Sequence, residues 1–161
     1  MLSIEKKILT VGALLPELAR LRFQDKKIVF TNGCFDILHR GHVDYLSRAA
    51  ELGDVFIVGL NSDASVSRLK GSTRPIQDQY SRSIILAALQ CVSYVILFDE
   101  DTPYNLIKAV QPDILVKGGD YTEISKIVGF DIVTQRGGKV MTIPFVEGFS
   151  TTGILEKISK L

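Results

Sequence analysis

Cysteine and histidine are scarce in this chain of 161 residues, and tryptophan is absent. The two cysteines, Cys34 and Cys91, are too few for the disulfide framework of a small secreted domain and lack the close spacing of a zinc site. No stretch approaches the roughly 18 consecutive apolar residues of a spanning helix, and residues 1–7 lack the apolar segment of a signal peptide. We therefore expect a soluble cytoplasmic protein with reduced thiols and no membrane partner.

An excess of either charge is also missing. Nineteen lysine and arginine residues face 18 acidic residues, which leaves a net charge of +1. No overall field attracts nucleic acid, so any bound phosphate must be held by a few placed side chains and backbone N–H groups. With 46% hydrophobic residues, a chain of this length has the material for a single core.

Short apolar runs rich in β-branched and aromatic residues alternate with longer amphipathic segments. The runs predict buried strands at residues 27–31, 55–60, 94–98, 113–117 and 139–143. The amphipathic segments predict helices at residues 11–23, over residues 43–50 and 84–89, after an N-cap at Thr102 with Pro103 in the first position, and at the end, where Ile154, Leu155 and Ile158 form an inner stripe. This alternation indicates a Rossmann-like α/β fold, with a central five-stranded parallel sheet and helices on both faces.

In such a sheet, ligands bind outside the carboxyl ends of the strands. Residues 31–42, T-N-G-C-F-D-I-L-H-R-G-H, follow the first predicted strand and contain both histidines of the chain, His39 and His42. Three residues apart, these histidines face the same side of a first helical turn, where free N–H groups also favour an anion. The two histidines have two other interpretations. They could be ordinary capping or packing residues, or they could bind zinc, although further zinc ligands at a usable spacing are missing.

Two separated segments resemble one known family. Residues 35–42, F-D-I-L-H-R-G-H, resemble the F-D-x-x-H-x-G-H signature of the cytidylyltransferase-like superfamily, and residues 147–154, E-G-F-S-T-T-G-I, are similar to its S-T-T motif. Segments at residues 61–63, 69–71, 74–76, 98–103 and 116–121 resemble the nucleotidyltransferase domain of the ADP-heptose synthase family.

The resemblance implies a nucleotidyltransferase fold in a single domain, residues 1–161, with a peripheral N-terminal helix within residues 1–24 and a catalytic core at 25–161. It implies an adenylyltransferase that moves AMP from ATP to D-glycero-β-D-manno-heptose 1-phosphate, giving ADP-heptose and pyrophosphate for lipopolysaccharide or other surface-glycan synthesis. It further implies Mg²⁺ accompanying ATP, a homodimer, and a stand-alone form of a domain that is often fused to a sugar kinase.

The same resemblance assigns roles to individual residues. His39, His42 and Lys70 are the implied catalytic residues, with Lys70 in a glycine-flanked loop that closes over the phosphates. The implied nucleotide-binding residues are Thr31, Asn32, Gly33, Phe35, Asp36, Gly41, Gly118, Gly119, Asp120, Ser150, Thr151 and Thr152. Asn61, Arg74 and Arg82 are the implied clamp on the substrate phosphates.

Several of these roles have simpler alternatives. Asp36 either binds magnesium, orients a histidine or caps a turn. Ser150 or Thr151 could simply cap the last helix, and Gly118 and Gly119 could form a tight turn. Arg74 could lie on a solvated surface, and Arg82 could form a local ion pair. Cys34, with no evident base beside it, is interpreted as a small filler.

The base and the acceptor are the least readable features. Glycerol-3-phosphate cytidylyltransferases carry an arginine in R-T-E-G-I-S-T-T, and Phe145 stands at that place here, either enclosing a purine or packing in the core. Residues 121–138, with Tyr121, Glu123, Lys126 and Arg136, either contact the sugar or form a solvated face. The alternative functions are a cytidylyltransferase acting on glycerol 3-phosphate or phosphoethanolamine, and a non-catalytic nucleotide-binding regulatory module.

Overall fold

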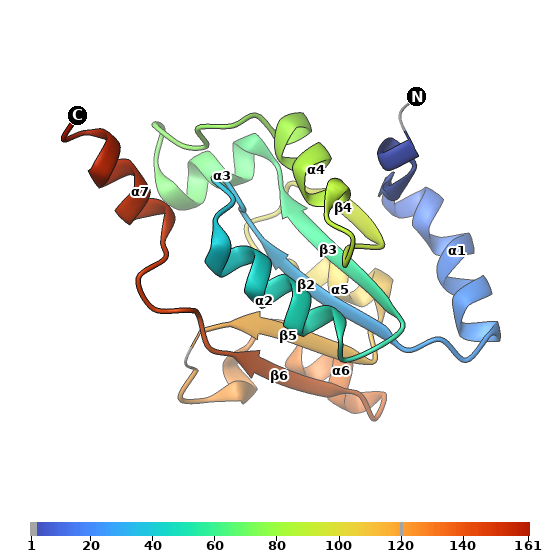
Figure 1. The fold of residues 1–161 in the computed structure, drawn as a ribbon. Coiled ribbons are helices and arrows are strands. Elements are labelled where there is room, and N and C mark those ends of the chain that lie inside the picture. Colours follow the sequence, from blue (N-terminus) through green and yellow to red (C-terminus); the bar gives the residue numbers. More distant parts are fainter. Residues whose placement is uncertain (1–2, 120) are drawn as a thin grey trace.

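The computed structural model describes residues 3–119 and 121–161, and in this part of the chain six parallel strands form one sheet. The strands are β1 (Ile8–Leu9), β2 (Ile28–Gly33), β3 (Val55–Asn61), β4 (Tyr94–Phe98), β5 (Ile114–Gly118) and β6 (Lys139–Ile143). Their order across the sheet is β1-β4-β3-β2-β5-β6 (Figure 1). The predicted parallel α/β sheet is confirmed, and the five predicted strands are present. The sixth, β1, is too short to leave a sequence pattern.

The described residues also form seven α-helices and two 3₁₀ turns. The helices are α1 (Val11–Phe23), α2 (Arg40–Ala50), α3 (Asp63–Lys70), α4 (Gln79–Ala88), α5 (Tyr104–Val110), α6 (Phe130–Gln135) and α7 (Thr151–Ile158), and the 3₁₀ turns are η1 (Ser3–Lys7) and η2 (Ile124–Lys126). Helix α1 has the predicted bounds. Helix α5 begins one residue later than predicted, because Pro103 and not Thr102 occupies the N-cap position.

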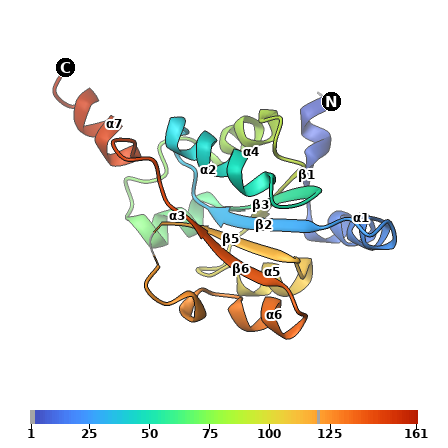
Figure 2. The same ribbon diagram turned by 60° about the horizontal axis from the view of Figure 1, so that its bottom comes forward.

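Alternate residues of the strands feed two separate cores. In β2, Ile28 and Phe30 pack in the cluster that contains α1, α5 and α6, whereas Val29 packs in the cluster that contains α2 and α4. The view along the sheet shows α2 and α4 on one side and α5 and α6 on the other (Figure 2). Both faces of the central strands are therefore buried, which explains why their sequences are continuously apolar.

The N-terminal segment is more than the peripheral element expected from the sequence. Leu14, Leu18 and Leu21 of α1 are buried in the same cluster as strands β2 and β3. Strand β1 pairs with β4 and covers that edge of the sheet. The segment therefore completes the fold on one face and at one edge.

The C-terminal helix differs from its prediction. Ile154, Leu155 and Ile158 do not form an inner stripe, because no residue of α7 is buried and Ile158 is 58% exposed. Figure 1 shows α7 extending from the body of the molecule beyond the carboxyl ends of the strands, where no second layer faces it. The amphipathic pattern indicated a helix correctly but not what the helix packs against.

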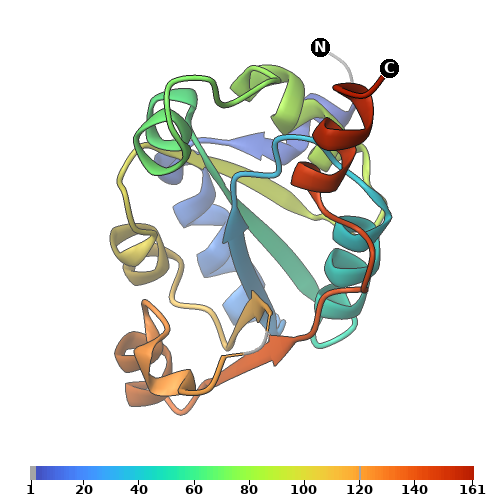
Figure 3. The same ribbon diagram turned by 90° about the vertical axis from the view of Figure 1, so that its left-hand side faces the viewer.

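The strand order reverses between β2 and β5. From β2 the chain proceeds to β3 and β4 on one side, and later places β5 and β6 on the other. Such a switch point is where ligands bind in open parallel sheets. Figure 3 looks onto this end of the strands, with α7 (red) at the upper right. Among the described residues, no helix is long and apolar enough to cross a membrane.

Candidate active site

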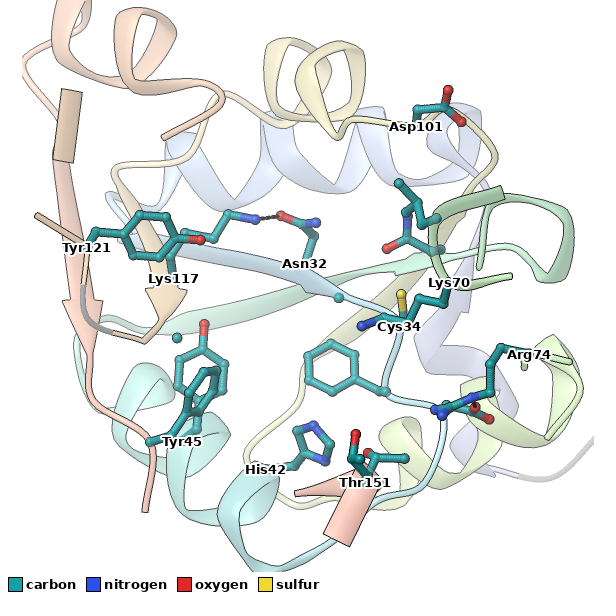
Figure 4. A pocket seen from close by; sticks show the side chains of 18 residues that line it. Asn32, Cys34, His42, Tyr45, Lys70, Arg74, Asp101, Lys117, Tyr121 and Thr151 are labelled. Carbon is teal, nitrogen blue, oxygen red and sulfur yellow. Dashed lines mark hydrogen bonds and ion pairs between the residues drawn. The ribbon is translucent and has the colours of Figure 1, made fainter. Parts of the chain in front are cut away.

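A cavity of about 720 Å³ opens at the carboxyl ends of the strands (Figure 4). This volume lies within the range of roughly 300–1,000 Å³ that is usual for small-molecule sites. The predicted site residues that line it are Asn32, Gly33, Phe35, Asp36, His42, Asn61, Lys70, Arg74, Gly118, Thr151 and Thr152. Residues from both ends of the chain therefore meet in one place, as the two separated motifs predicted.

The two histidines lie together at the start of α2. Their rings stack with centroids 3.9 Å apart and planes inclined by 25°. His42 lines the cavity, while His39 occupies the N-cap position of the helix. Phe35, at a φ of 44°, places its ring edge-on to His42 at 5.3 Å. The turn before the helix therefore fixes the orientation of the His42 ring.

The Nδ1 atoms of both histidines are buried and have no hydrogen-bond partner within the described part of the chain. Buried polar atoms are nearly always bonded, so a pair left unsatisfied beside a cavity indicates a functional site more than ordinary packing. The zinc alternative has no support, because no group of three or more histidine, cysteine, aspartate or glutamate residues is suitably placed among those described.

Both imidazoles are neutral at pH 7. Burial, with a smaller contribution from the adjacent His39, lowers the pKa of His42 to about 4. Burial also lowers the pKa of His39 below its usual value of 6.5. Each neutral ring carries one N–H donor, although a hydrogen bond with the backbone of Ile37 already engages His42, and neither ring adds a full positive charge.

The lowered pKa of His42 predicts that the fold loses stability in mild acid. Between pH 6.5 and about 4, the unfolded chain binds a proton at this position that the folded chain does not bind. The contribution of His42 to the free energy of unfolding should therefore be constant above pH 6.5 and fall by up to about 3 kcal/mol through this window. Chemical denaturation at a series of pH values measures it, and His42→Asn should show a shallower dependence. Parallel curves for the two proteins would contradict the expectation.

Two helix N-termini border the cavity. No side chain caps α2, so the N–H groups of Arg40 and Gly41 remain available to an anion, while the His42 N–H donates to the His39 carbonyl oxygen at 2.9 Å. At α7, the Oγ of Ser150 accepts a hydrogen bond from the Gly153 N–H at 3.0 Å, while Thr151 and Thr152 line the cavity. Ser150 is thus the helix cap, and the two threonines are the residues of this motif that line the cavity.

Asp36 is buried, and its carboxylate organises the loop that follows α3. Its Oδ1 accepts hydrogen bonds from the N–H groups of Ile76 at 2.8 Å and Gln77 at 3.0 Å, and its Oδ2 accepts one from Arg74 Nε at 2.5 Å. Burial alone raises the pKa of Asp36, but these bonds outweigh it, and the pKa lies below its usual value.

Of the three interpretations of Asp36, the structure favours the capped turn. Three protein donors engage its two oxygens, so the carboxylate has a structural role, and contact with magnesium, directly or through water, stays a prediction. Magnesium that arrives with the phosphates of ATP stays a prediction. Arg74 accordingly lies against Asp36 and is only partly exposed, rather than forming a solvated surface.

Arg82 does not reach the cavity, which corrects its assignment to the phosphate clamp. Its side chain is fully buried and donates to the carbonyl oxygens of Cys34 at 2.6 Å and Gln77 at 3.0 Å, and to Asp63 Oδ1 at 2.7 Å. The local ion pair considered for this residue is therefore the one observed. Arg82 holds the wall of the site in place from behind.

Thr31 is likewise structural. Its hydroxyl is buried and bonds with the Tyr45 hydroxyl at 2.6 Å and the Val116 carbonyl oxygen at 2.9 Å. Gly41 also lies outside the cavity lining, and a Cβ there would lie 3.1 Å from the His39 ring and from Phe149, so its role is close packing. These two predicted nucleotide-binding residues support the site from beneath.

Lys70 ends helix α3 rather than standing in a loop, and its side chain is exposed beside the cavity. Gly71 follows it at a φ of 97°, a conformation that favours glycine and ends the helix there. Among the described residues no carboxylate forms an ion pair with Lys70, so its charge is available to a ligand.

Phe145 lies against the glycine pair that follows β5. A Cβ on Gly118 would lie only 2.4 Å from the Phe145 ring, so this glycine serves a close approach, and Gly119 has a φ of 110°. The Phe145 ring is 56% exposed, lines the cavity and lies 6.0 Å from the Tyr45 ring. It is therefore a wall of the site and not a core residue. Asp120, predicted to bind the nucleotide, lies outside the described residues.

The segment expected to contact the sugar contributes little. Tyr121 lines the cavity, but Glu123 and Lys126 pair with each other at the surface. Arg136 lies in a different pocket, with Arg22 and Asp113, and donates to Gln111. For most of this segment the solvated-face interpretation holds.

Lys117 and Tyr45 line the cavity and had been given no role from the sequence. Lys117 comes near the end of β5, donates a hydrogen bond to Asn32 Oδ1, and has its pKa lowered by burial to about 8. Burial raises the pKa of the Tyr45 hydroxyl. The sequence signal for Lys117 was a lysine that interrupts an apolar strand just before two glycines. The signal for Tyr45 was weaker, namely its position one helical turn after His42.

Comparison with known sequences gives a consistent result. A sequence profile of the cytidylyltransferase-like family matches residues 30–157. Proteins named bifunctional protein HldE are 55% identical over 154 residues in Citrifermentans bemidjiense and 61% identical over 138 residues in Nitratiruptor sp.. The alignments cover 96% and 86% of this chain but 31% and 29% of the relatives, so the chain spans about a third of their length.

Two solved structures share the fold. One, described as a lipopolysaccharide core biosynthesis protein from Thermoplasma volcanium, is 31% identical with a TM-score of 0.59, covering 75% of this chain and 97% of that one. The other is a pantoate-beta-alanine ligase from Francisella tularensis, 17% identical with a TM-score of 0.64, covering 96% of this chain and 78% of that one. At that identity the second shows a common fold alone.

Proposed function

Because the chain belongs to the cytidylyltransferase-like family of nucleotidyltransferases, we propose that it transfers AMP from ATP to D-glycero-β-D-manno-heptose 1-phosphate. The products are ADP-heptose, which is a precursor for lipopolysaccharide or other surface-glycan synthesis, and pyrophosphate. The proposal includes magnesium carried by ATP, a cytoplasmic location and a homodimer.

The observation that carries the proposal is the stacked histidine pair beside the cavity. Two neutral imidazoles with unsatisfied nitrogen atoms lie at the uncapped N-terminus of α2, and Thr151 and Thr152 at the start of α7 border the same space. Neutral N–H donors and helix N-termini together suit a polyphosphate. A binding module needs such groups for affinity. A transferase also needs them to stabilise the negative charge that develops on the phosphate oxygens during transfer.

The reaction needs positioning more than proton transfer. An oxygen of the acceptor phosphate attacks the α-phosphorus of ATP, a new phosphorus–oxygen bond forms, and the bond to the β-phosphate oxygen breaks to release pyrophosphate. The attacking phosphate is already ionised at pH 7, so no strong base is required. His42 donates to the phosphate oxygens as charge shifts onto them, and Lys70 approaches from the end of α3.

Two observations favour adenine and a heptose over cytosine and a polyol. Phe145 presents an exposed aromatic ring to the cavity where cytidylyltransferases of the competing group carry arginine. A ring in that place offers a flat surface to a purine. For the acceptor, the segments that resemble ADP-heptose synthase and the 31% identical lipopolysaccharide core biosynthesis protein point the same way.

Pyrophosphate release tests the proposal directly. ATP or CTP is offered with magnesium against the heptose 1-phosphate, other sugar 1-phosphates, glycerol 3-phosphate and phosphoethanolamine. We expect turnover with ATP and the heptose 1-phosphate, none without acceptor, and at least about tenfold lower kcat/KM for CTP.

Other outcomes have distinct meanings. Turnover with CTP and a polyol phosphate would overturn the choice of base and acceptor but keep the enzyme class. Tight nucleotide binding with no release for any pair would identify a regulatory module instead.

A further inference from the structure

The cavity contains two cationic side chains that no described carboxylate neutralises. Arg74 is paired with Asp36, and Asp101, the other acidic residue in the described lining, is paired with Arg68 at 2.8 Å. The two remaining cations are Lys70 and Lys117. A reaction between two anionic substrates needs positive charge for each of them, so the site has one such lysine for each substrate.

Lys117 is positioned by the sheet itself. It follows Leu115 by two residues, as Asn32 follows Phe30, and Phe30 and Leu115 are partners across β2 and β5. The two side chains therefore emerge on the same side of neighbouring strands at the switch point, where Lys117 donates to the Asn32 amide oxygen. The ammonium group has three donors, and this neutral partner uses one.

A lysine in this environment favours an anionic ligand. Burial lowers its pKa to about 8, which shows that the charged form is poorly solvated there. An amide oxygen orients the ammonium group without neutralising it. A bound anion would restore both the charge balance and the missing hydrogen bonds.

The placement separates Lys117 from the groups assigned to the phosphates of ATP. Figure 4 shows Lys117, Asn32 and Tyr121 on one side of the cavity and His42 and Thr151 on the other, with Lys70 and Arg74 at a third. The polyphosphate donors that line the cavity, which are His42 and the start of α7, therefore face Lys117 across the open space. A second anion bound at Lys117 would lie opposite the leaving pyrophosphate, as in-line attack requires.

We propose that Lys117, held by Asn32, binds the phosphate of the acceptor and aims it at the α-phosphorus of ATP. The inference rests on the proposed transferase function and deepens it by assigning the acceptor subsite. Asn32 is a positioning residue in this arrangement, since it acts through the lysine. A sugar or polyol phosphate monoester is the class of ligand that the subsite takes.

The test separates the two substrates kinetically. In Lys117→Met we expect the KM for the acceptor to rise about 10- to 100-fold, the loss of a charged hydrogen bond, while the KM for ATP changes by less than about twofold. Lys117→Arg, which keeps the charge, should recover part of the acceptor affinity, and Asn32→Ala should shift the acceptor KM in the same direction by less. Lys108→Met, on the exposed side of α5, is the matched control and should leave both constants unchanged.

Three results would overturn the inference. The first is a rise in the KM for ATP instead of the KM for the acceptor, and the second is unchanged KM values in Lys117→Met. The third is an equal loss of acceptor affinity in Lys117→Met and Lys117→Arg when thermal melting shows that both proteins are folded. If the wild-type protein shows no turnover, the transferase proposal fails separately. Calorimetry with inorganic phosphate then still decides on Lys117: weaker binding in Lys117→Met with unchanged ATP binding supports the subsite, and equal binding refutes it.

Discussion

Replacing His42 by alanine is expected to lower kcat by about 10²–10³ while the protein stays folded. His42 lines the cavity, and its ring is held by the stack with His39 and the edge contact with Phe35. The loss of one well-placed donor to a transition state typically has an effect of this size. Because the donor matters most as charge develops, the fall should appear in kcat more than in the KM for ATP. Pyrophosphate release at saturating substrates measures it.

Two variants control this result. His42→Asn retains a side-chain N–H and should lose less activity than His42→Ala. Arg48→Ala changes an exposed residue of the same helix, paired with Asp44 at 3.7 Å, and should leave kcat unchanged. A kcat for His42→Ala within about threefold of the wild-type value, in a protein that melts normally, would exclude the role proposed for this histidine.

The sheet could be predicted because burial on both faces leaves a plain mark in the sequence. Strands such as β4, Tyr94–Phe98, are short apolar runs between turn residues, and their bounds follow directly. What α7 packs against left no such mark. The helix has an apolar side, but it lies beyond the sheet and none of its residues is fully buried. Periodicity reports that a helix has an apolar side, and only the tertiary structure decides whether that side is covered.

The site could be predicted as a place more reliably than as a set of roles. The two motifs meet at the carboxyl ends of the strands because strand order brings the start of α2 and the start of α7 together. Adjacent residues of a motif then point in opposite directions, because side chains alternate between the two faces of a strand. Asn32 reaches the cavity, while the adjacent Thr31 turns to the core and bonds Tyr45. Motif spacing cannot assign these directions, because the register and the packing layer decide them.

Replacing Arg82 by methionine is expected to lower the free energy of unfolding by about 2–4 kcal/mol. The guanidinium is fully buried and donates to two carbonyl oxygens, those of Cys34 and Gln77. Each partly buried acceptor left without a donor costs about 1–3 kcal/mol. Asp63, 40% exposed, is resolvated when its partner is lost and adds little. Urea denaturation at pH 7 measures the change, against a total stability of roughly 5–15 kcal/mol for a domain.

The same variant distinguishes the two roles considered for Arg82. A phosphate clamp on the surface of the cavity would lose activity with unchanged stability, whereas a buried anchor loses stability first. Arg68→Met is the matched control, since its ion pairs with Asp99 and Asp101 are exposed and should contribute less than about 1 kcal/mol. Equal unfolding curves for Arg82→Met and the wild type, combined with lost turnover, would mean that Arg82 belongs to the phosphate clamp after all.

Arg82 also affects the site indirectly. It bonds the carbonyl oxygen of Cys34, which lies in the cavity wall on the loop that leads to the histidine pair. Some loss of kcat should therefore accompany the loss of stability, and it should shrink at lower temperature as the loop is held more firmly.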